Sequence, residues 1–201
     1  MTKPKLLCLI SGGIDSPVAA HLMLTKGYTV EFVNCDLTPV GNDYTRTKIE
    51  KLVKQLSKLH KKKLKLTFVE HGKQLVKFYQ KLDEKEQKQL CLLCRRRMLK
   101  QGQKLAKKIN AKALITGENL AQVASQTLDN LYVEDKAVSI PILRPLIGFN
   151  KQDIIDIARK IGTYEISIGP GGCCNITPNR PEVRADTTEI NRIEKKVSKK
   201  Y

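Results

Sequence analysis

Short apolar runs alternate with amphipathic segments along most of the chain. Apolar runs typical of buried β-strands occur at residues 6–10, 29–34, 64–69, 113–116 and 140–146. Apolar residues at helical spacing predict helices over residues 18–25, 44–59, 73–82, 87–109, 119–130 and 151–161. Strands that alternate with helices predict an α/β fold, with a parallel five-stranded sheet and helices on both faces, in a single domain.

The last part of the chain departs from this pattern. Residues 163–185 contain a stretch rich in glycine and proline, which predicts an irregular loop, and this loop carries Cys173 and Cys174. Residues 187–201 have the pattern of a basic amphipathic helix with a loose end. We therefore expect one domain over residues 1–185, with the cysteine-bearing loop at 163–185, and a basic C-terminal helix or tail over residues 186–201.

The turn after the first predicted strand has the sequence Ser-Gly-Gly-Ile-Asp-Ser at residues 11–16, followed by Pro17. Glycine accepts unusual backbone angles, and proline suits the first turn of a helix. Backbone N–H groups and the positive end of the helix then converge on one point, which favours an anion. Asp15 would repel a phosphate unless a divalent metal bridged them, so the turn indicates a metal-bound polyphosphate.

This turn is not a Walker A loop, because no Gly-Lys-Ser/Thr closes it. The motif resembles the pyrophosphate loop (PP-loop) of the ATP pyrophosphatases, which release AMP and pyrophosphate. A glycine turn without a ligand is the simpler alternative. The segments 34–36 and 116–118 also follow predicted strands, and the carboxyl ends of parallel strands form the ligand crevice of such sheets. Their convergence supports the interpretation as a nucleotide site.

Composition and charge narrow the function. The chain has 201 residues, 41% of them hydrophobic, which suits one globular domain. No apolar stretch is long enough to span a bilayer and no signal peptide is evident, so we expect a cytoplasmic protein without membrane association. The net charge is +17, with basic clusters at residues 60–65, 95–97 and 195–200. Such charge favours nucleic acid, and a lysine-rich solvated surface is the alternative.

The six cysteines indicate metal or thiol chemistry, because a cytoplasmic chain of this size does not need disulfides. Cys8 fits a strand core. Cys91 and Cys94 have metal-ligand spacing, and Cys173-Cys174 could complete a site. The residues leave open a closed zinc site, a three-thiolate iron–sulfur site with one free thiol, and a persulfide on Cys174. Basic side chains at 95–97 would lower nearby thiol pKa values.

Histidine offers no obvious catalytic base in this sequence. His21, His60 and His71 are interpreted as surface or helix residues.

Several longer motifs follow one another in a set order. They are residues 11–19, residues 117–131 (Gly-Glu-Asn-Leu-Ala-Gln-Val-Ala-Ser-Gln-Thr-Leu-Asp-Asn-Leu), residues 144–147, residues 161–165 and Cys173-Cys174. Together they resemble the PP-loop domain of the tRNA 4-thiouridine synthetases, the tRNA sulfurtransferases, over about residues 5–185. The resemblance implies an adenine nucleotide alpha hydrolase-like fold that uses ATP and Mg²⁺. It also implies adenylation of O4 of uridine 8 in tRNA and its replacement by sulfur, which gives 4-thiouridine.

The resemblance also implies site residues. Arg95 would balance phosphate charge, Gly117 would allow close backbone approach, and Gln126 would bind a phosphate or AMP unless it only packs its helix. The positions that match the family's nucleotide site are Leu9, Ile10, Ser11, Gly12, Gly13, Asp15, Ser16, Asn34, Cys35, Arg95, Gly117 and Gln126.

The catalytic residues implied by the resemblance are Asp15 and a loop cysteine. Spacing to Pro181 favours Cys174 over Cys173 as the active thiol, with Cys173 as the alternative. Archaeal-type members hold an iron–sulfur cluster on a Cys-x-x-Cys pair and a loop cysteine, positions that Cys91, Cys94 and Cys174 occupy here. Zinc is the alternative metal.

Two expected departures from the family concern partners. Family members carry an N-terminal module with a THUMP domain that binds tRNA, and many bacterial members carry a rhodanese domain as sulfur donor. We expect neither domain in this sequence. The expected lack of a rhodanese domain favours an iron–sulfur cluster over a persulfide relay. We expect tRNA as a partner, delivered by a separate THUMP-type protein or bound by the basic surface, together with a sulfur donor, and a homodimer is open. Alternatives are a PP-loop enzyme that thiolates another RNA position or activates a small molecule, and a non-catalytic ATP- or tRNA-binding subunit.

Overall fold

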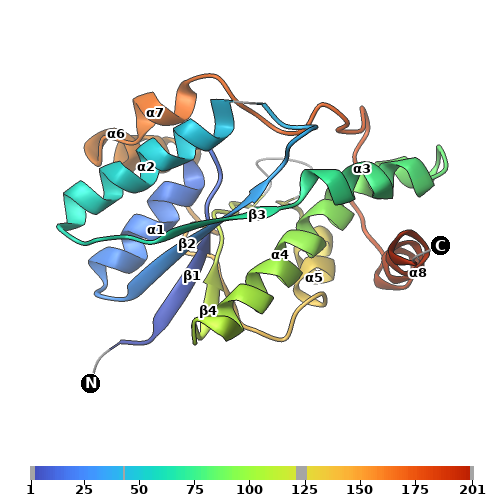
Figure 1. Ribbon diagram of the computed structural model, residues 1–201, viewed down its shortest axis with the longest axis horizontal. Helices are drawn as coiled ribbons and strands as arrows, with labels where there is room; N and C mark the ends of the chain where they lie inside the picture. The colour runs from blue at the N-terminus through green and yellow to red at the C-terminus, as the bar shows by residue number, and fades with distance from the viewer. Residues whose placement is uncertain (1–2, 43, 121–125, 200–201) are drawn as a thin grey trace.

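A single parallel sheet organises the molecule (Figure 1). The computed structural model describes residues 3–42, 44–120 and 126–199. In these residues the sheet has five strands in the order β3-β2-β1-β4-β5, and each neighbouring pair is parallel. The strands are β1 (Lys5–Leu9), β2 (Thr29–Asp36), β3 (Leu66–Glu70), β4 (Ala113–Ile115) and β5 (Ile142–Leu143). The predicted fold class is confirmed.

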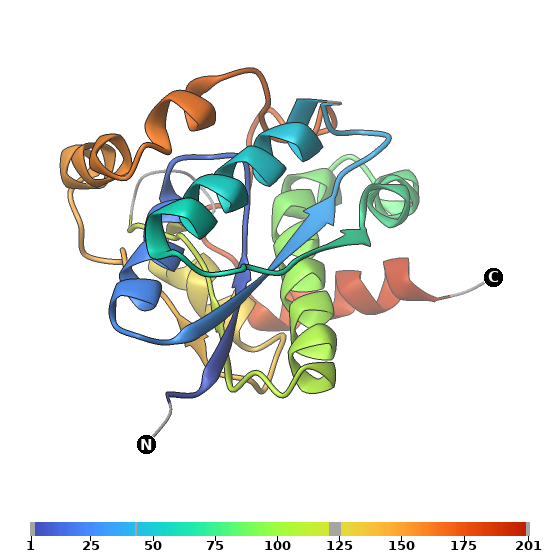
Figure 2. The same ribbon diagram turned by 60° about the vertical axis from the view of Figure 1, so that its left-hand side comes forward.

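Helices cover both faces of the sheet (Figures 1 and 2). One layer contains α1 (Asp15–Thr25), α2 (Tyr44–His60), α6 (Lys151–Lys160) and α7 (Tyr164–Ile168), which contact one another. The other side is covered by α4 (Leu90–Lys108), which contacts β1 and β4 and is preceded by the 3-10 turn η1 (Glu86–Gln89). Around α4 lie α3 (Gly72–Lys81), α5 (Leu128–Asp135) and α8 (Thr187–Ser198).

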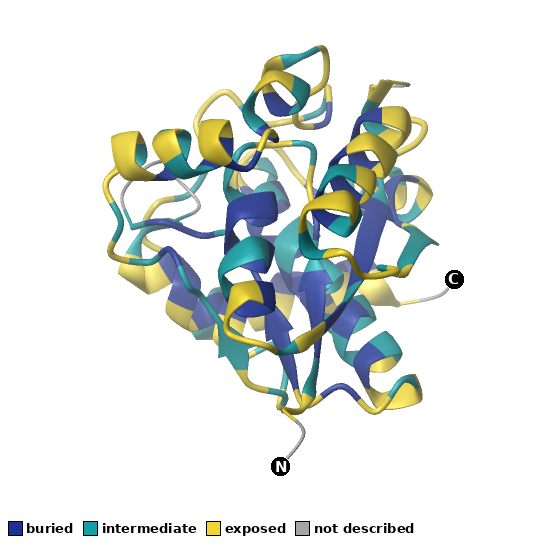
Figure 3. Ribbon diagram, turned by 90° about the vertical axis from the view of Figure 1, so that its left-hand side faces the viewer, coloured by how far each residue is buried: buried dark blue, intermediate teal, exposed yellow. Residues whose placement is uncertain are grey.

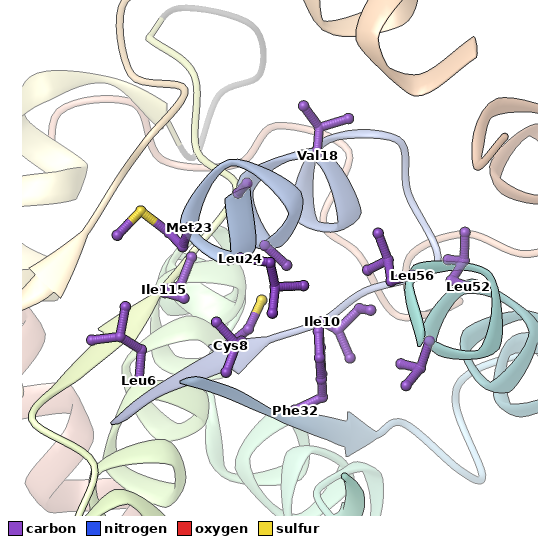
Figure 4. Packing of buried hydrophobic residues seen from close by; sticks show 14 of the residues in the cluster. Leu6, Cys8, Ile10, Val18, Met23, Leu24, Phe32, Leu52, Leu56 and Ile115 are labelled. Atoms are coloured by element: carbon purple, nitrogen blue, oxygen red, sulfur yellow. The ribbon is translucent and has the colours of Figure 1, made fainter. Parts of the chain in front are cut away.

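Alternation along β1 explains how the sheet is buried on both faces. Leu6, Cys8 and Ile10 pack toward α1 and α2, in a cluster that Figure 4 shows with Leu24 and Phe32. Leu7 belongs to the opposite cluster, against α4. The middle of β1 and most of β2 are therefore buried, as Figure 3 shows, and the prediction that Cys8 is a core residue is confirmed.

A second apolar cluster lies beyond the sheet, between α3, α4 and α8. Ile190, Ile193 and Val197 place one face of α8 in this cluster, and Cys174 joins it from the cysteine-bearing loop. The predicted basic helix is thus present, but it is docked rather than loose. An ion pair between Arg96 and Glu194, 2.8 Å apart, fixes α8 on α4.

Several predicted boundaries were wrong. The helix predicted at 87–109 is η1 followed by α4, and the loop predicted at 163–185 contains α7. Of the helix predicted at 119–130, residues 121–125 lie outside the described residues. The helix α5 starts at Leu128 and continues to Asp135, and the side chain of Thr127 caps its first turn by accepting a hydrogen bond from the backbone N–H of Asn130. The run predicted at 140–146 contains only two strand residues, because Pro141 and Pro145 lack the N–H that a ladder needs.

The strand order reverses between β1 and β4, the central pair from which the sheet grows in both directions. In open parallel sheets a crevice forms beyond the carboxyl ends of the strands at such a point. The turn at residues 11–16 follows β1, and residues 116–118 follow β4, so the fold brings both to this crevice. In the described ranges, no helix combines the length and apolar character that a membrane crossing requires.

Candidate functional site

The turn between β1 and α1 is held closed by its own serines. The backbone N–H of Ser11 donates to Ser16 Oγ at 2.9 Å, and the two hydroxyl oxygens lie 3.1 Å apart. The N–H of Gly13 donates to Ser11 Oγ at 3.3 Å. The loop is thereby fixed at the positive end of α1, an arrangement suited to phosphate.

Asp15, the first residue of α1, meets a lysine from the far end of the chain. Lys151 Nζ lies 2.5 Å from Asp15 Oδ1, and Lys151 is the first residue of α6. Lys151 was not among the predicted site residues, because no local spacing connects residues 136 positions apart. Its only sequence signal is a lysine at the start of a predicted helix, which is common on surfaces.

Gly117 makes a close backbone approach, but to the protein's own chain. A Cβ at Gly117 would lie 2.7 Å from the backbone N of Ser16 and 2.9 Å from its Cα. Backbone atoms cannot move aside as a flexible side chain can, so the turn after β4 can pack against the start of α1 only with glycine here. Gly117 therefore helps to set the shape of the turn at residues 11–16, which we call the phosphate loop.

A cavity of about 230 Å³ opens at this crevice. The sequence-predicted nucleotide residues line it, with the exception of Gly13: Leu9, Ile10, Ser11, Gly12, Asp15, Ser16, Asn34, Cys35, Arg95, Gly117 and Gln126. Thr116 and Glu118 also line it, from the segment 116–118 that was predicted to reach the crevice. The lining residues that sequence reasoning missed are Val33, Leu37, Thr45, Met98, Leu99 and Gly172. Most of these are apolar and could not be told from core residues in the sequence.

Two polar side chains at the cavity contrast in their bonding. Asn34 Nδ2 donates to the carbonyl O of Ile10 at 2.9 Å and so ties the ends of β2 and β1 together. The hydroxyl of Thr45, at the start of α2, has no hydrogen-bond partner among the described residues although it is buried. A buried donor without a partner is costly, so Thr45 is suited to a ligand in the cavity.

Arg95 lies at the cavity, but its charge is already balanced. Its guanidinium contacts Glu118, and its Nε lies 2.5 Å from Glu134 Oε1. Burial alone would lower the pKa of Arg95, but Glu134 and Glu118 outweigh this and raise it. The resemblance implies that Arg95 balances phosphate charge, but in this structure its charge is already paired with two glutamates.

The other arginines of the predicted basic cluster at 95–97 also contact groups of the protein itself. Arg96 is buried and pairs with Glu194, and the guanidinium of Arg97 lies 6.0 Å from the ring centre of Phe78. Two of the three cations at 95–97 are thus paired with glutamates inside the protein, and binding of a polyanion by this cluster stays a prediction.

Gln126 contacts the backbone just after Gly117. Its Oε1 accepts a hydrogen bond from the backbone N–H of Asn119 at 3.2 Å, and its side chain lines the cavity. Gln126 therefore has a structural contact as well as a place at the cavity, so the alternative that it only packs is met in part. The intervening residues 121–125 of the long sequence motif lie outside the described residues.

The cysteines of the loop lie near those at the start of α4, Cys91 and Cys94. Cys174 packs in the same apolar cluster as Cys94. Burial, followed by the nearby charge of Cys173, raises the pKa of Cys91 to about 11 and also raises that of Cys94. All six cysteines are free. Within residues 3–42, 44–120 and 126–199, no three His, Cys, Asp or Glu side chains are placed to hold a metal ion.

The two loop cysteines differ in exposure. Cys173 is exposed, whereas Cys174 is buried. A hydrogen bond from the Cys174 thiol lowers the pKa of Cys173 and raises that of Cys174. The sequence preference for Cys174 as the reactive thiol therefore meets a structural objection, since the accessible thiol is Cys173.

His71 is the clearest correction among the histidines. It is fully buried between β3 and α3, with Nε2 3.2 Å from Cys94 Sγ and Nδ1 2.9 Å from Gln101 Oε1. Burial lowers the pKa of His71 to about 4. The interpretation of His71 as a surface or helix residue was wrong. The sequence places it between a predicted strand and a predicted helix, but it does not show which side chains pack over it. His21 and His60, by contrast, lie on helices, with Nδ1 and Nε2 3.0 Å apart.

Comparisons with known proteins agree with this geometry. The family model described as thiamine biosynthesis protein (ThiI) matches residues 1–199. A relative from Methanosarcina acetivorans named "Probable tRNA sulfurtransferase" is 41% identical over 197 residues, which is 98% of this chain and 47% of the relative. A relative of the same name from Methanocaldococcus jannaschii is 40% identical over 194 residues, covering 96% of this chain and 50% of the relative.

A solved structure agrees as well. The crystal structure of a 4-thiouridine synthetase–RNA complex with bound ATP superimposes with a TM-score of 0.90 at 34% identity, over 96% of this chain and 50% of that chain. The chain spans about half the length of the curated relatives it matches. The family match, the phosphate loop and the cavity around it lead to one conclusion: this chain belongs to the ThiI family.

Proposed function

We propose that this chain is the ATP-dependent part of a tRNA sulfurtransferase that adenylates O4 of a tRNA uridine, at position 8, and replaces that oxygen with sulfur to give 4-thiouridine. One observation carries the proposal: a cavity beside the phosphate loop is lined by the residues that match the family's nucleotide site. The similarity to a 4-thiouridine synthetase that was solved with RNA and ATP supports it.

The phosphate loop would bind the triphosphate of ATP. Its backbone N–H groups, the serine hydroxyls and the end of α1 would contact the phosphate oxygens. The unpartnered hydroxyl of Thr45 would donate to the same ligand. Leu9, Ile10 and the other apolar lining residues would contact the nucleoside.

Asp15 and Lys151 would hold the charged end of the nucleotide. A carboxylate at the edge of a phosphate site fits Mg²⁺, which typically binds one or two carboxylates together with phosphate oxygens. When bound, Mg²⁺ would neutralise charge on the pyrophosphate group. Lys151 would orient the Asp15 carboxylate and add positive charge near the departing pyrophosphate.

The reaction we propose has two steps. In the first, O4 of the uridine attacks the α-phosphorus of ATP, the bond from that phosphorus to the bridging oxygen breaks, and pyrophosphate leaves. In the second, a sulfur nucleophile attacks C4 and AMP leaves with the former O4. Fixed backbone donors at the phosphate loop would stabilise the charge that develops in the first step.

Cys173 and Cys174 are the proposed thiols for the second step. Cys173 is exposed and follows Gly172, which lines the cavity, so a sulfur carried there would lie beside the nucleotide site. A persulfide on this cysteine would attack C4 through its terminal sulfur. A neighbouring thiol would then attack the inner sulfur, which leaves the sulfur on the uridine and a disulfide on the protein. Free sulfide would need no such second thiol.

We also propose that an iron–sulfur cluster or zinc is held by Cys91, Cys94 and Cys174. The donor types suit either metal, but as they stand the thiols are not gathered around one point, at least within the described ranges. Iron, zinc and sulfide content of anaerobically purified protein will test the set, with Cys91→Ser as the comparison.

The partners we propose are tRNA, a sulfur donor and a THUMP-type tRNA-binding protein. We also propose a homodimer, which a measurement of molecular mass in solution tests. The net charge of +17 supports tRNA as the polyanion.

The decisive experiment measures pyrophosphate release and tRNA nucleosides together. We expect Mg–ATP to give pyrophosphate only with unmodified tRNA, and mass spectrometry to find 4-thiouridine when a sulfur source is added. Asp15→Ala should abolish both products. Equal pyrophosphate release with small carboxylic acids in place of tRNA would contradict the proposal and favour a small-molecule ligase.

A further inference from the structure

Lys48 is a buried lysine that nothing in the proposed reaction uses. It lies one turn into α2 and is only 9% exposed. Its Nζ donates to the carbonyl oxygens of Ser167 at 3.0 Å and of Gly169 at 2.6 Å. Burial lowers its pKa. No ion pair of the described residues includes Lys48, and the partners of its ammonium are these two carbonyl dipoles.

The stem of the same side chain covers the phosphate loop. A Cβ at Gly12 would lie 2.9 Å from Lys48 Cδ. A second contact joins the same elements, because Ser167 Oγ donates to the carbonyl O of Gly13 at 3.3 Å. The loop, α2 and the end of α7 are therefore one connected unit.

The ammonium group also borders the segment that leads to the loop cysteines. A Cβ at Gly171 would lie 3.1 Å from Lys48 Nζ, and Gly171 has a φ of +142°, which favours glycine. This segment passes the start of α2 in Figures 1 and 2 and is held again where Asn175 N–H donates to the carbonyl O of Val40 at 2.9 Å. Between the two anchors lie Cys173 and Cys174.

We propose that Lys48 is a positioning residue that couples occupancy of the phosphate loop to the placement of Cys173 beside the cavity. The inference rests on the proposed function, because it takes the anion in the loop to be a nucleoside triphosphate. An anion arriving at Gly12 attracts the ammonium, whose bonds to the carbonyls of Ser167 and Gly169 then weaken, and the segment after Gly169 shifts. Thiol placement would thus follow nucleotide binding.

The test measures Cys173 alkylation with and without nucleotide. The 201-residue chain is treated with iodoacetamide at constant pH, with or without Mg–ATP, and fragmentation mass spectrometry separates Cys173 from Cys174. Calorimetry first establishes that Mg–ATP binds. In the unmodified chain we expect Mg–ATP to change the alkylation rate of Cys173 at least about fivefold.

Two variants and one control examine the coupling. Lys48→Met keeps a flexible stem over Gly12 but removes the charge, and should bring the ratio of the two rates close to one while ATP affinity changes less than about tenfold. Lys51→Met, at an exposed position of the same helix, should behave as the unmodified chain. Because loss of Lys48 could also loosen α2, Gly171→Ala breaks the same contact from the other side and should likewise abolish the nucleotide effect.

Three results would overturn the inference. A rate ratio of one in the unmodified chain, despite calorimetric binding, would overturn it alone. So would a ratio in Lys48→Met equal to that of the unmodified chain. Absence of any binding heat from Mg–ATP would overturn the proposed function and this inference together.

Discussion

Lys151 Nζ lies 2.5 Å from Asp15 Oδ1, so the first residue of α6 meets the first residue of α1 at the mouth of the phosphate loop. The two side chains are 38% and 23% exposed. Exposed and half-exposed ion pairs contribute only about 0–1 kcal/mol to folding. We therefore expect the pair to contribute little to the free energy of folding and to act mainly through the charge that it places beside a bound ligand.

Lys151→Met is expected to lower tRNA-dependent pyrophosphate release at least about 100-fold, because it removes the positive charge beside the departing group. The melting temperature should change by only a few degrees at most, about what loss of such a pair allows. Lys160→Met, at the exposed far end of α6, is the matched control. Full activity in Lys151→Met would remove Lys151 from the proposed site.

Gly117→Ala should destabilise the protein and weaken ATP binding at the same time. The added Cβ meets backbone atoms of Ser16 at 2.7 and 2.9 Å, so the start of α1 must move. We expect a loss of about 1–3 kcal/mol in the free energy of unfolding, as for overpacking in general. Calorimetry should show at least about tenfold weaker ATP binding.

The control for this substitution is Gly148→Ala. Nothing lies within 4 Å of a Cβ at Gly148, so the same chemical change should leave stability and ATP binding nearly unaltered. Equal effects of the two substitutions would mean that the contact of Gly117 with α1 is unimportant.

Glu194 should make stability depend on pH through the docking of α8. Burial alone would raise its pKa, but hydrogen bonds from Lys100 and Arg96 outweigh this and hold the pKa of Glu194 below its usual value. A lowered carboxyl pKa stabilises the fold above the unfolded-state pKa of about 4.3. That contribution is lost as the pH falls through the lower folded-state value.

Glu194→Gln is therefore expected to unfold about 1–2 kcal/mol more easily at pH 7, since Arg96 stays buried without its carboxylate. Urea titrations at pH 7 and at pH 3 should show that the difference from the unmodified chain shrinks in acid. Glu50→Gln, which alters an exposed pair with Arg46, is the control and should show little effect at either pH. A constant difference at both pH values would show that Glu194 acts through packing alone.

Serine substitutions should separate the roles of the two loop cysteines. Neither Cys173 nor Cys174 lines the cavity, so pyrophosphate release should stay within about threefold in both variants. Formation of 4-thiouridine should be lost in both. Metal content should fall only in Cys174→Ser, since Cys174 packs with Cys94 whereas Cys173 is exposed. Loss of pyrophosphate release in either variant would instead make that cysteine part of the nucleotide site.

Local sequence determined the features that depend on neighbouring residues. The apolar runs and their spacing predicted the sheet, because burial on both faces of a parallel strand requires a continuous apolar run. The turn at residues 11–16 was also predictable, because glycines, serines and Pro17 affect the backbone at or next to their own positions. The cavity residues at the ends of β1, β2 and β4 followed from the fold class, since parallel strands end at one edge.

Tertiary structure alone decided which distant groups meet. Lys151 reaches Asp15, Lys48 joins α7 to the phosphate loop, and His71 contacts Cys94, each across a sequence separation that no local pattern encodes. Burial likewise separated Cys173 from Cys174, and glutamates from other elements paired with Arg95 and Arg96. The physical reason is common to all of them: charge pairing and burial depend on what packs against a side chain, and packing partners are set by the whole fold.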